Sequence, residues 1–251
     1  MKKSIGLKHF SSKQEELMRQ DFVKVFKENP IPDAEILPNL GLFLNSKNLS
    51  RILFMQHIYQ QIINTHGIVV EFGTRWGQNI ALFSALRGIY EPFNRHRKIV
   101  GFDTFEGFPS IARQDAKSDM MKTGNYAVTE NYEEYLDQIM NYHEKENPLS
   151  HIKKYEIRKG NAVTEMKKYL KMNPETIISL VYFDMDLYAP TKQCIGLIKN
   201  RLTKGSIVAF DELCDHDCPG ETLAVMETFG LNNIRLQRWP HVARISYFVV
   251  E

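Results

Sequence analysis

The sequence predicts an α/β fold: a doubly wound, mainly parallel sheet of seven strands, with an antiparallel C-terminal hairpin and an N-terminal helical extension. Short, continuous apolar runs recur along the chain, and stretches with helical periodicity separate most of them. Such runs are typical of strands buried on both faces, and strands that alternate with helices form right-handed crossovers. Two strand-like runs at the end of the chain predict the hairpin.

Each element follows from its own stretch of sequence. Residues 68–72 (IVVEF) form the first apolar run, which Gly73 closes. Further core strands are expected at residues 98–102, 155–158, 177–183 and 206–210, and the hairpin pairs 233–238 with 244–250. Helices are expected at residues 78–87, 161–172 and 190–202. Together these elements make one main domain, residues 67–251.

Residues 1–66 are expected to form the helical extension. Apolar residues recur at three-to-four spacing between Leu17 and Phe26, a proline-containing break follows at 29–32, and residues 50–63 again place apolar side chains on one helix face. Within the main domain, residues 110–150 form one long polar, tyrosine-rich stretch. Irregular segments of that length in α/β proteins are usually lids or disordered, and we expect a lid at 110–125 and a helix at 131–142.

The composition of the 251-residue chain excludes several classes of function. Lys and Arg total 32 against 30 Asp and Glu, a net charge of +2 that lacks the basic excess of nucleic-acid-binding proteins. The 3 cysteines are too few for a secreted disulfide framework, and the basic start lacks the apolar core of a signal peptide. No apolar run approaches the ~20 residues that cross a bilayer. We therefore expect a cytoplasmic protein without nucleic-acid or membrane partners.

The turns after the first two strands indicate a ligand site. Small residues in the turn at 73–77 allow a ligand to approach the backbone, but the G-x-G-x-x-G spacing of a dinucleotide site is absent. Glu71, two places before Gly73, suits the amino acid end of a nucleoside ligand better than a diphosphate. Asp103 ends the second strand, where it could accept hydrogen bonds from a ribose diol. The alternative for the turn is that it only connects a strand to a helix. The alternative for Asp103 is a helix N-cap or turn aspartate.

Carboxylates follow two further strands. Asp184 comes directly after one apolar strand, and Asp211 and Glu212 follow the next. Neighbouring parallel strands would bring these groups together, and clustered carboxylates repel one another unless a cation or basic partner lies between them. All-oxygen ligation suits a hard ion such as Mg²⁺. A helix cap with a surface ion pair is the alternative.

A short run of potential metal ligands lies just beyond these carboxylates. Cys214, His216 and Cys218 have the pattern C-x-H-x-C, which departs from the spacing of structural zinc sites. Zinc is therefore the weaker interpretation, and loop thiols near an active site are the alternative. His216 is a candidate acid or base because the pKa of a free histidine lies near neutrality.

Four motifs, in this order, resemble the macrocin-type O-methyltransferases, which are metal-dependent class I S-adenosylmethionine enzymes. They are EFGTRWG at 71–77, GFDTFEGFP at 101–109, DMDLYAPT at 184–191, and the acidic pair at 211–212. The resemblance covers about residues 49–250. It implies a Rossmann-like methyltransferase domain at 67–251, with the lid inserted at about 110–150.

The resemblance also implies roles for individual residues. The turn of Glu71, Gly73 and Gly77 would line the methionine end of the cofactor, Asp103 would hold its ribose, and residues 160–162 would lie beside its adenine. The full implied cofactor set is Glu71, Gly73, Thr74, Gly77, Asp103, Thr104, Phe105, Gly160, Asn161, Ala162 and Asp184. The implied Mg²⁺ ligands are Asp184, Asp211 and Glu212, where the family usually has two aspartates in the last pair.

These observations support one leading function and several alternatives. The leading hypothesis is methyl transfer from S-adenosylmethionine, with Mg²⁺, to a hydroxyl of a sugar or sugar-containing small molecule, with Asp184 or His216 removing the proton. N-methylation, phenol methylation and a catalytically silent binding module remain alternatives. An NAD-dependent oxidoreductase is disfavoured because the dinucleotide fingerprint is missing. We expect a homodimer, since helical extensions often pair subunits.

Overall fold

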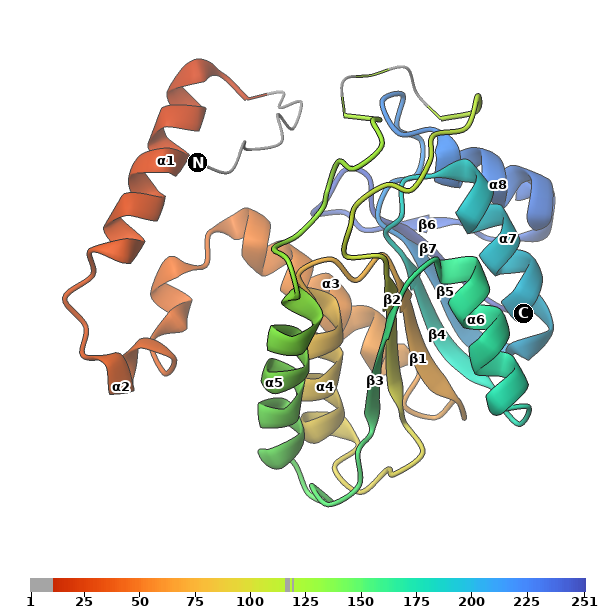
Figure 1. The fold of residues 1–251 in the computed structure, drawn as a ribbon, viewed down its shortest axis with the longest axis horizontal. Coiled ribbons are helices and arrows are strands. Elements are labelled where there is room, and N and C mark those ends of the chain that lie inside the picture. The colour runs from red at the N-terminus through yellow and green to blue at the C-terminus, as the bar shows by residue number, and fades with distance from the viewer. Residues whose placement is uncertain (1–10, 116–117, 119) are drawn as a thin grey trace.

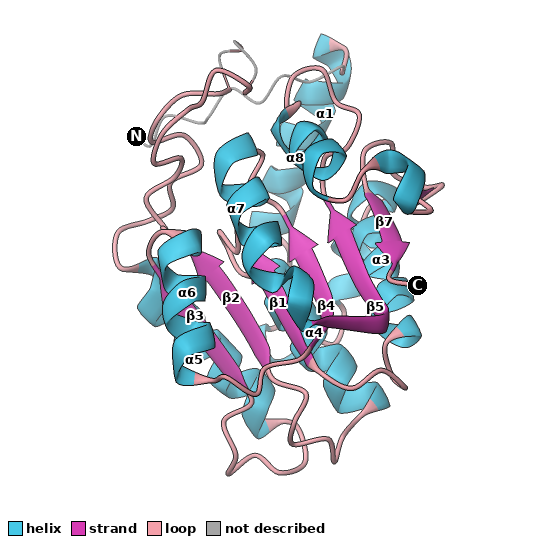
Figure 2. Cartoon of the chain, turned by 90° about the vertical axis from the view of Figure 1, so that its right-hand side faces the viewer, coloured by secondary structure: helices cyan, strands magenta, loops and turns pink. Residues whose placement is uncertain are grey.

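A computed structural model describes residues 11–115, 118 and 120–251, and it confirms the predicted fold class. Seven strands form one sheet in the order β3-β2-β1-β4-β5-β7-β6 (Figures 1 and 2). Their bounds are β1 (Ile68–Phe72), β2 (Ile99–Asp103), β3 (Tyr155–Lys159), β4 (Ile178–Phe183), β5 (Leu202–Phe210), β6 (Gln237–Arg238) and β7 (Ser246–Val249). Strands β1 to β5 run parallel, and β7 lies antiparallel between β5 and β6.

Helices cover both faces of the sheet. One face packs against α3 (Ser46–Gln61), α4 (Gln78–Tyr90) and α5 (Tyr132–Lys145), and the other packs against α6 (Ala162–Met172), α7 (Tyr188–Ile198) and α8 (Gly220–Thr228) (Figure 1). Alternate residues of the core strands feed the two layers: Val69 lies in one hydrophobic cluster and Val70 in the other. Because both faces are covered, the core strands carry apolar side chains at nearly every position.

Two predicted elements are shorter in the structure, and one helix was not predicted. The helix predicted at 190–202 ends earlier, at Ile198. The 3-10 turn η2 (Lys199–Arg201) follows it, and Leu202 already pairs with Ile178 as the first residue of β5. The predicted strand at 233–238 is reduced to β6, since only its last two residues pair with β7, and another 3-10 turn, η3 (Leu231–Asn233), takes its start. Helix α8 was not predicted.

The N-terminal segment forms an arm that projects beside the main body (Figure 1). The arm contains α1 (Lys13–Lys27), α2 (Asp33–Ile36) and the 3-10 turn η1 (Leu40–Phe43), and it continues into α3. Ser12 and Glu15 cap α1 reciprocally, each side chain accepting a hydrogen bond from the other's backbone N–H. No residue of α1 is buried. Residues 1–10 of the extension expected at 1–66 lie outside the described residues, and the domain boundary stays a prediction.

The segment between β2 and β3 contains an irregular part and one helix. Helix α5 occupies the place of the helix predicted at 131–142. Three residues of the lid expected at 110–125 lie outside the described residues. The described part packs Phe108, Met120 and Met121 against Leu187 and Cys218 in a small hydrophobic cluster of its own. This cluster attaches the lid segment to the loops that follow β4 and β5.

None of the helices in the described part of the chain is both long and apolar enough to cross a membrane.

Candidate active site

A cavity of about 490 Å³ opens at the carboxyl ends of β1, β2, β4 and β5. This edge includes the place between β1 and β4 where the strand order reverses, which is where ligands bind in open α/β sheets. The wall combines strand-end residues with residues of α3, the lid segment and the loop before β7. The predicted site residues that line it are Gly73, Thr74, Asp103, Thr104, Gly160, Asn161, Ala162, Asp184, Asp211 and Glu212.

The turn after β1 lies close to the loop after β4. Gly73 has a φ of +92°, and a β-carbon there would overlap the carbonyl oxygen of Asp184. Only glycine fits such a close approach of two chain segments. Gly77 also has a positive φ, +78°, and it begins α4 against the side chain of Leu136. The two glycines thus allow the turn after β1 to pack closely against the loop after β4 and against α5. Gly77 is not among the described residues that line the cavity.

Glu71 lies behind this turn with one unsatisfied oxygen. Its Oε1 accepts a hydrogen bond of 2.6 Å from Asn79 Nδ2, whereas its Oε2 is buried without a partner. Desolvation raises the pKa of Glu71 well above its ordinary value, and the Asn79 hydrogen bond opposes that shift. A buried, unpartnered carboxylate oxygen is costly. Glu71 is not among the described residues that line the cavity, so its predicted contact with the methionine end of the cofactor stays a prediction.

Asp103 holds two turns at the end of β2. Its Oδ2 accepts from the Arg75 N–H at 2.7 Å, and its Oδ1 accepts from the Phe105 N–H at 2.6 Å. Burial raises its pKa, and these two hydrogen bonds oppose the shift. A carboxylate oxygen can accept more than one hydrogen bond, and Asp103 lines the cavity, so the turn role and the predicted ribose role are compatible. Phe105, also predicted to bind cofactor, packs in the hydrophobic core at a φ of 60° and is not among the described residues that line the cavity, so its cofactor role stays a prediction.

Asp184 and Asp211 share one cation, the guanidinium of Arg51. Arg51 Nη2 lies 2.8 Å from Asp184 Oδ2, and Arg51 Nη1 lies 2.8 Å from Asp211 Oδ1. The Tyr182 hydroxyl donates to the same Asp211 oxygen at 2.6 Å. Desolvation, followed by the charge of Asp211, raises the pKa of Asp184. The basic partner that such carboxylates require is therefore a residue of α3.

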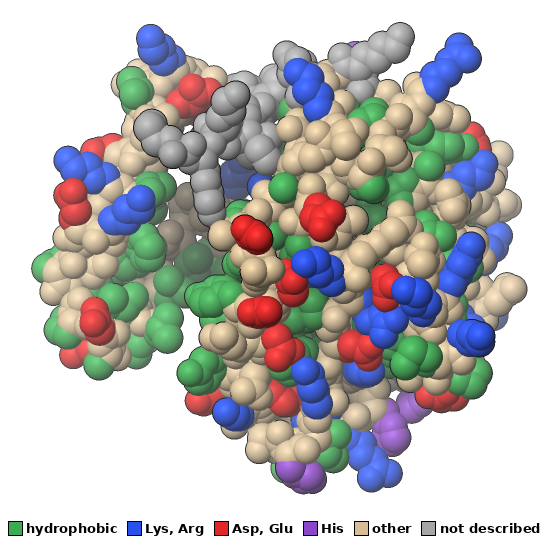
Figure 3. Space-filling view, in the orientation of Figure 1, with side chains coloured by type: hydrophobic (Ala, Val, Ile, Leu, Met, Phe, Trp, Pro, Cys, Tyr) green, Lys and Arg blue, Asp and Glu red, His purple; other side chains and the backbone are tan. Residues whose placement is uncertain are grey.

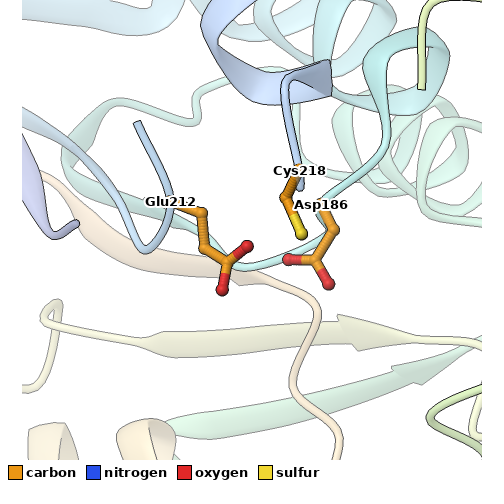
Figure 4. Close-up of side chains that lie close together, drawn as sticks. All are labelled: Asp186, Glu212 and Cys218. Carbon is orange, nitrogen blue, oxygen red and sulfur yellow. The ribbon is translucent and has the colours of Figure 1, made fainter. Parts of the chain in front are cut away.

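Glu212 belongs to a second group. Ligand atoms of Asp186, Glu212 and Cys218 all lie within 4.8 Å of one another, and in Figure 4 the two carboxylates and the thiol point toward a shared space. Arg244 Nη1 lies 2.6 Å from Glu212 Oε1, whereas Glu212 Oε2 is buried without a partner. Desolvation and the neighbouring Glu212 raise the pKa of Asp186 well above its ordinary value.

Glu221 positions the loop that carries these acids. It lies in the first turn of α8, and its Oε1 accepts from the backbone N–H groups of Met185 at 3.0 Å and Asp186 at 3.3 Å. The loop is thereby held with Asp186 at a φ of 60°, a left-handed conformation that favours glycine. Helix α8 thus fixes where the carboxylate of Asp186 lies.

The predicted set and the observed site overlap incompletely. Cys218 lies with the carboxylates, whereas Cys214 and His216 are exposed on the loop after β5, and His216 is not among the described residues that line the cavity. The proposed proton-transfer role of His216 therefore stays a prediction without a supporting contact. The residues that sequence reasoning missed are Arg51, Tyr182, Asp186 and Glu221. Only Asp186 carried a signal, its place in the D-x-D motif.

Comparisons with known proteins give a close match in solved structures. The chain is 37% identical to the calicheamicin methyltransferase CalS11, over 98% of this chain and 96% of that chain, with a TM-score of 0.93. An apo structure of CalS11, described as a TDP-rhamnose 3'-O-methyltransferase of calicheamicin biosynthesis, is 36% identical over 96% of each chain, with a TM-score of 0.85.

A more distant match supports the fold alone. The O-methyltransferase NovP is 18% identical over 80% of this chain and 79% of that chain, with a TM-score of 0.61. No protein-family model and no curated protein sequence matches the chain. The identity to CalS11 over almost the whole length agrees with the four motifs and with the cavity at the switch point of the sheet. The chain therefore belongs to the macrocin-type family of S-adenosylmethionine-dependent methyltransferases.

Proposed function

We propose that this enzyme transfers the methyl group of S-adenosylmethionine to a hydroxyl of a sugar, carried on a nucleotide or in a glycoside. The observation that carries the proposal is a single cavity in which the strand-end turns of a class I methyltransferase meet a cluster of carboxylates after β4 and β5. The similarity to CalS11, a TDP-rhamnose 3'-O-methyltransferase, supports a sugar acceptor. It favours hydroxyl methylation over the amine and phenol alternatives.

The residues after β1 and β2 fit the cofactor. The unpartnered Oε2 of Glu71 suits the donors of an amino acid group, and Gly73 leaves the turn open to close approach. Asp103 lines the cavity with lone pairs free for a ribose diol. When bound, S-adenosylmethionine supplies an electrophilic methyl group on its sulfonium. The task left to the chain is to align the acceptor oxygen with that methyl group and to exclude water.

The carboxylates supply the oxygen ligands that a hard divalent ion prefers. Asp184 and Asp211 share one cation in this structure, and Glu212, which lies with Asp186 and Cys218, offers its unpartnered Oε2 as a third oxygen. We propose that Asp184, Asp211 and Glu212 hold Mg²⁺, which when bound acts as a Lewis acid and a template for vicinal hydroxyls. One carboxylate on this edge accepts the proton of the sugar hydroxyl as the new C–O bond forms and the S–CH₃ bond breaks. Asp184 and Asp186 are the candidates that line the cavity.

The direct test combines calorimetry with a transfer assay. Purified protein is titrated with S-adenosylmethionine, and then with a nucleotide sugar in the presence of Mg²⁺ or EDTA. We expect micromolar cofactor binding with or without metal, and methylated sugar only with metal. Absence of cofactor binding under every condition would refute the cofactor assignment. Full turnover in EDTA would refute the metal assignment and leave the methyltransferase intact.

The arm supports a second part of the proposal, a homodimer. Met18 and Val25, which are 63% and 52% exposed, lie on one face of α1, and Figure 3 shows hydrophobic side chains gathered on the arm. Within the arm, α1 packs Phe22 and Phe26 against Phe43, while Met18 and Val25 stay exposed, and a helix of this length depends on packing for its stability in water. We therefore propose that the extension at residues 1–66 pairs with a second copy of the chain. In sedimentation, Met18→Glu with Val25→Glu should yield monomers, whereas Gln20→Glu, on the opposite face, should not.

The cysteines support the proposed location. Cys194 and Cys218 are buried, Cys214 is exposed, and all three are free thiols. Free thiols are typical of reducing compartments, so we propose that the enzyme acts in the cytoplasm. Fusing the chain to a fluorescent protein would test this by microscopy, and export of the fusion would contradict it.

A further inference from the structure

Arg51 occupies the space between two carboxylates that the proposed function assigns to a metal. Its two terminal nitrogens divide between them: Nη2 pairs with Asp184 at 2.8 Å and Nη1 pairs with Asp211 at 2.8 Å. The guanidinium therefore bridges the two carboxylates and does not form a bidentate pair with either of them. It reaches this position from α3, which is 133 residues from Asp184 in the sequence.

The remaining contacts of Arg51 are weak. Its Nε lies 3.4 Å from Asn79 Oδ1, at the long end of hydrogen bonding, and its Cζ lies 6.0 Å from the centre of the Tyr182 ring. The side chain is 27% exposed, and it lines the cavity. The two carboxylates thus supply most of its stabilisation, and open space adjoins it. A long side chain held in this way can leave the carboxylates and turn into the cavity.

A divalent ion and this guanidinium cannot both occupy the gap. Magnesium binds oxygens at about 2.0–2.1 Å and requires them in near-octahedral directions, whereas the lone pairs of Asp184 Oδ2 and Asp211 Oδ1 point at Arg51. A guanidinium left beside the ion would also place like charges within a few ångströms of each other in a partly desolvated site. Loading of the ion and pairing of Arg51 are therefore alternatives.

We infer that Arg51 is a built-in placeholder cation, which pairs with Asp184 and Asp211 while the metal site is empty and is displaced when a divalent ion binds. The inference rests on the proposed metal site. It explains how the empty site avoids leaving two adjacent carboxylates without a counter-charge. It also means that the affinity for the ion is lowered by the free energy needed to separate Arg51 from its partners.

The test is metal binding, measured without turnover. Mn²⁺ replaces Mg²⁺ as the probe, and free Mn²⁺ is counted by electron paramagnetic resonance in wild type, Arg51→Gln and Arg75→Gln at 0.15 M salt. We expect Arg51→Gln to bind Mn²⁺ at least about tenfold more tightly than wild type, since no ion pairs need to break. Arg75 lines the same cavity, and its guanidinium does not join two carboxylates in the described part of the chain, so Arg75→Gln should change affinity by less than about threefold at this ionic strength.

Thermal unfolding gives a second readout. In EDTA, Arg51→Gln should melt below wild type because its carboxylates lack a counter-charge, and Mg²⁺ should raise its melting temperature by more than it raises that of wild type. Equal or weaker Mn²⁺ binding by Arg51→Gln would overturn the inference while leaving the metal site in place. Absence of Mn²⁺ binding in every variant would overturn both the inference and the metal assignment. Calorimetric binding of S-adenosylmethionine would show that the variants are folded and would test the cofactor assignment separately.

Discussion

Two arginines, Arg97 and Arg51, each neutralise buried carboxylate charge, and their surroundings differ. Arg97 is 1% exposed and binds both oxygens of Glu91, at 2.8 and 3.0 Å. It also donates to the Ser179 hydroxyl. Three backbone carbonyl groups complete its shell, those of Ile62, Thr65 and Gly67. Groups in fixed positions therefore satisfy all the N–H donors of Arg97, and they hold the guanidinium in one place.

Arg51 has two strong partners, one long contact and an open cavity beside it. Its partners lie at strand ends on the ligand-binding edge, whereas Arg97 joins the chain segments before β1 and within β4 on the opposite edge. Removing an arginine from a closed shell such as that of Arg97 leaves a buried carboxylate without its cation, which is strongly destabilising. When one side of the shell is open, as at Arg51, the charged groups stay accessible to a ligand in the cavity.

The largest expected effect is on the closed shell. Arg97→Met leaves the Glu91 carboxylate buried without its cation, which should lower the free energy of unfolding by about 3–5 kcal/mol. Urea denaturation monitored by circular dichroism measures it. The matched control is Lys153→Met, which removes a pair whose side chains are 59% and 50% exposed, and it should change stability by less than about 1 kcal/mol. Equal losses in the two variants would break the comparison.

The second effect is on the open shell. Asp211→Asn removes one carboxylate of the Arg51 pair and one proposed metal ligand, so it should lower turnover by roughly 100-fold or more, equivalent to about 2.7 kcal/mol. Cofactor affinity should stay close to that of wild type, because Asp211 lies on the far side of β4 from the β1 turn. Calorimetry and a transfer assay measure the two quantities separately. Loss of cofactor binding would place Asp211 in the cofactor site instead.

The third effect compares a glycine beside the cavity with a glycine inside a helix. Gly73→Ala would force a β-carbon onto the Asp184 carbonyl at a positive φ, and it should destabilise the protein by more than about 1 kcal/mol and weaken cofactor binding. Gly196, inside α7, has open space around its α-carbon. Gly196→Ala should therefore stabilise the protein by about 0.5–1 kcal/mol through helix propensity. Thermal unfolding of both variants checks the opposite signs.

The smallest effect is a pH dependence that arises away from the site. Burial lowers the pKa of His57, whose Nε2 lies 2.9 Å from the Tyr247 hydroxyl. The unfolded chain therefore binds this proton more tightly, so the contribution of His57 to stability is complete above its unfolded pKa of about 6.5 and declines as the pH falls through the folded pKa. Between pH 7.5 and 5.5, His57→Gln should lose less stability than wild type. A steeper loss of stability in His57→Gln than in wild type would contradict the expected direction of the pH dependence.

Sequence patterns were sufficient for the sheet and for part of the site. Continuous apolar runs such as residues 68–72 have one favourable arrangement, between two helical layers, so strand positions followed from hydrophobicity alone. Asp103, Asp184 and Asp211 were placed at the ligand-binding edge because parallel strands bring their carboxyl ends together. Element ends were less predictable: of the strand expected at 233–238, only Gln237 and Arg238 pair with β7.

The class of fold, the cofactor edge and the presence of an acidic cluster follow from the amino-acid sequence, since each depends on local pattern and strand order. Which acids meet, and which group neutralises them, depends on how the helices pack around the sheet. Arg51 lies on a helix before the first strand, and no local pattern connects it with Asp184. Glu221 is likewise brought to the loop after β4 by the packing of α8 against α7. Charge pairing depends on distance in space, which packing fixes and sequence separation does not.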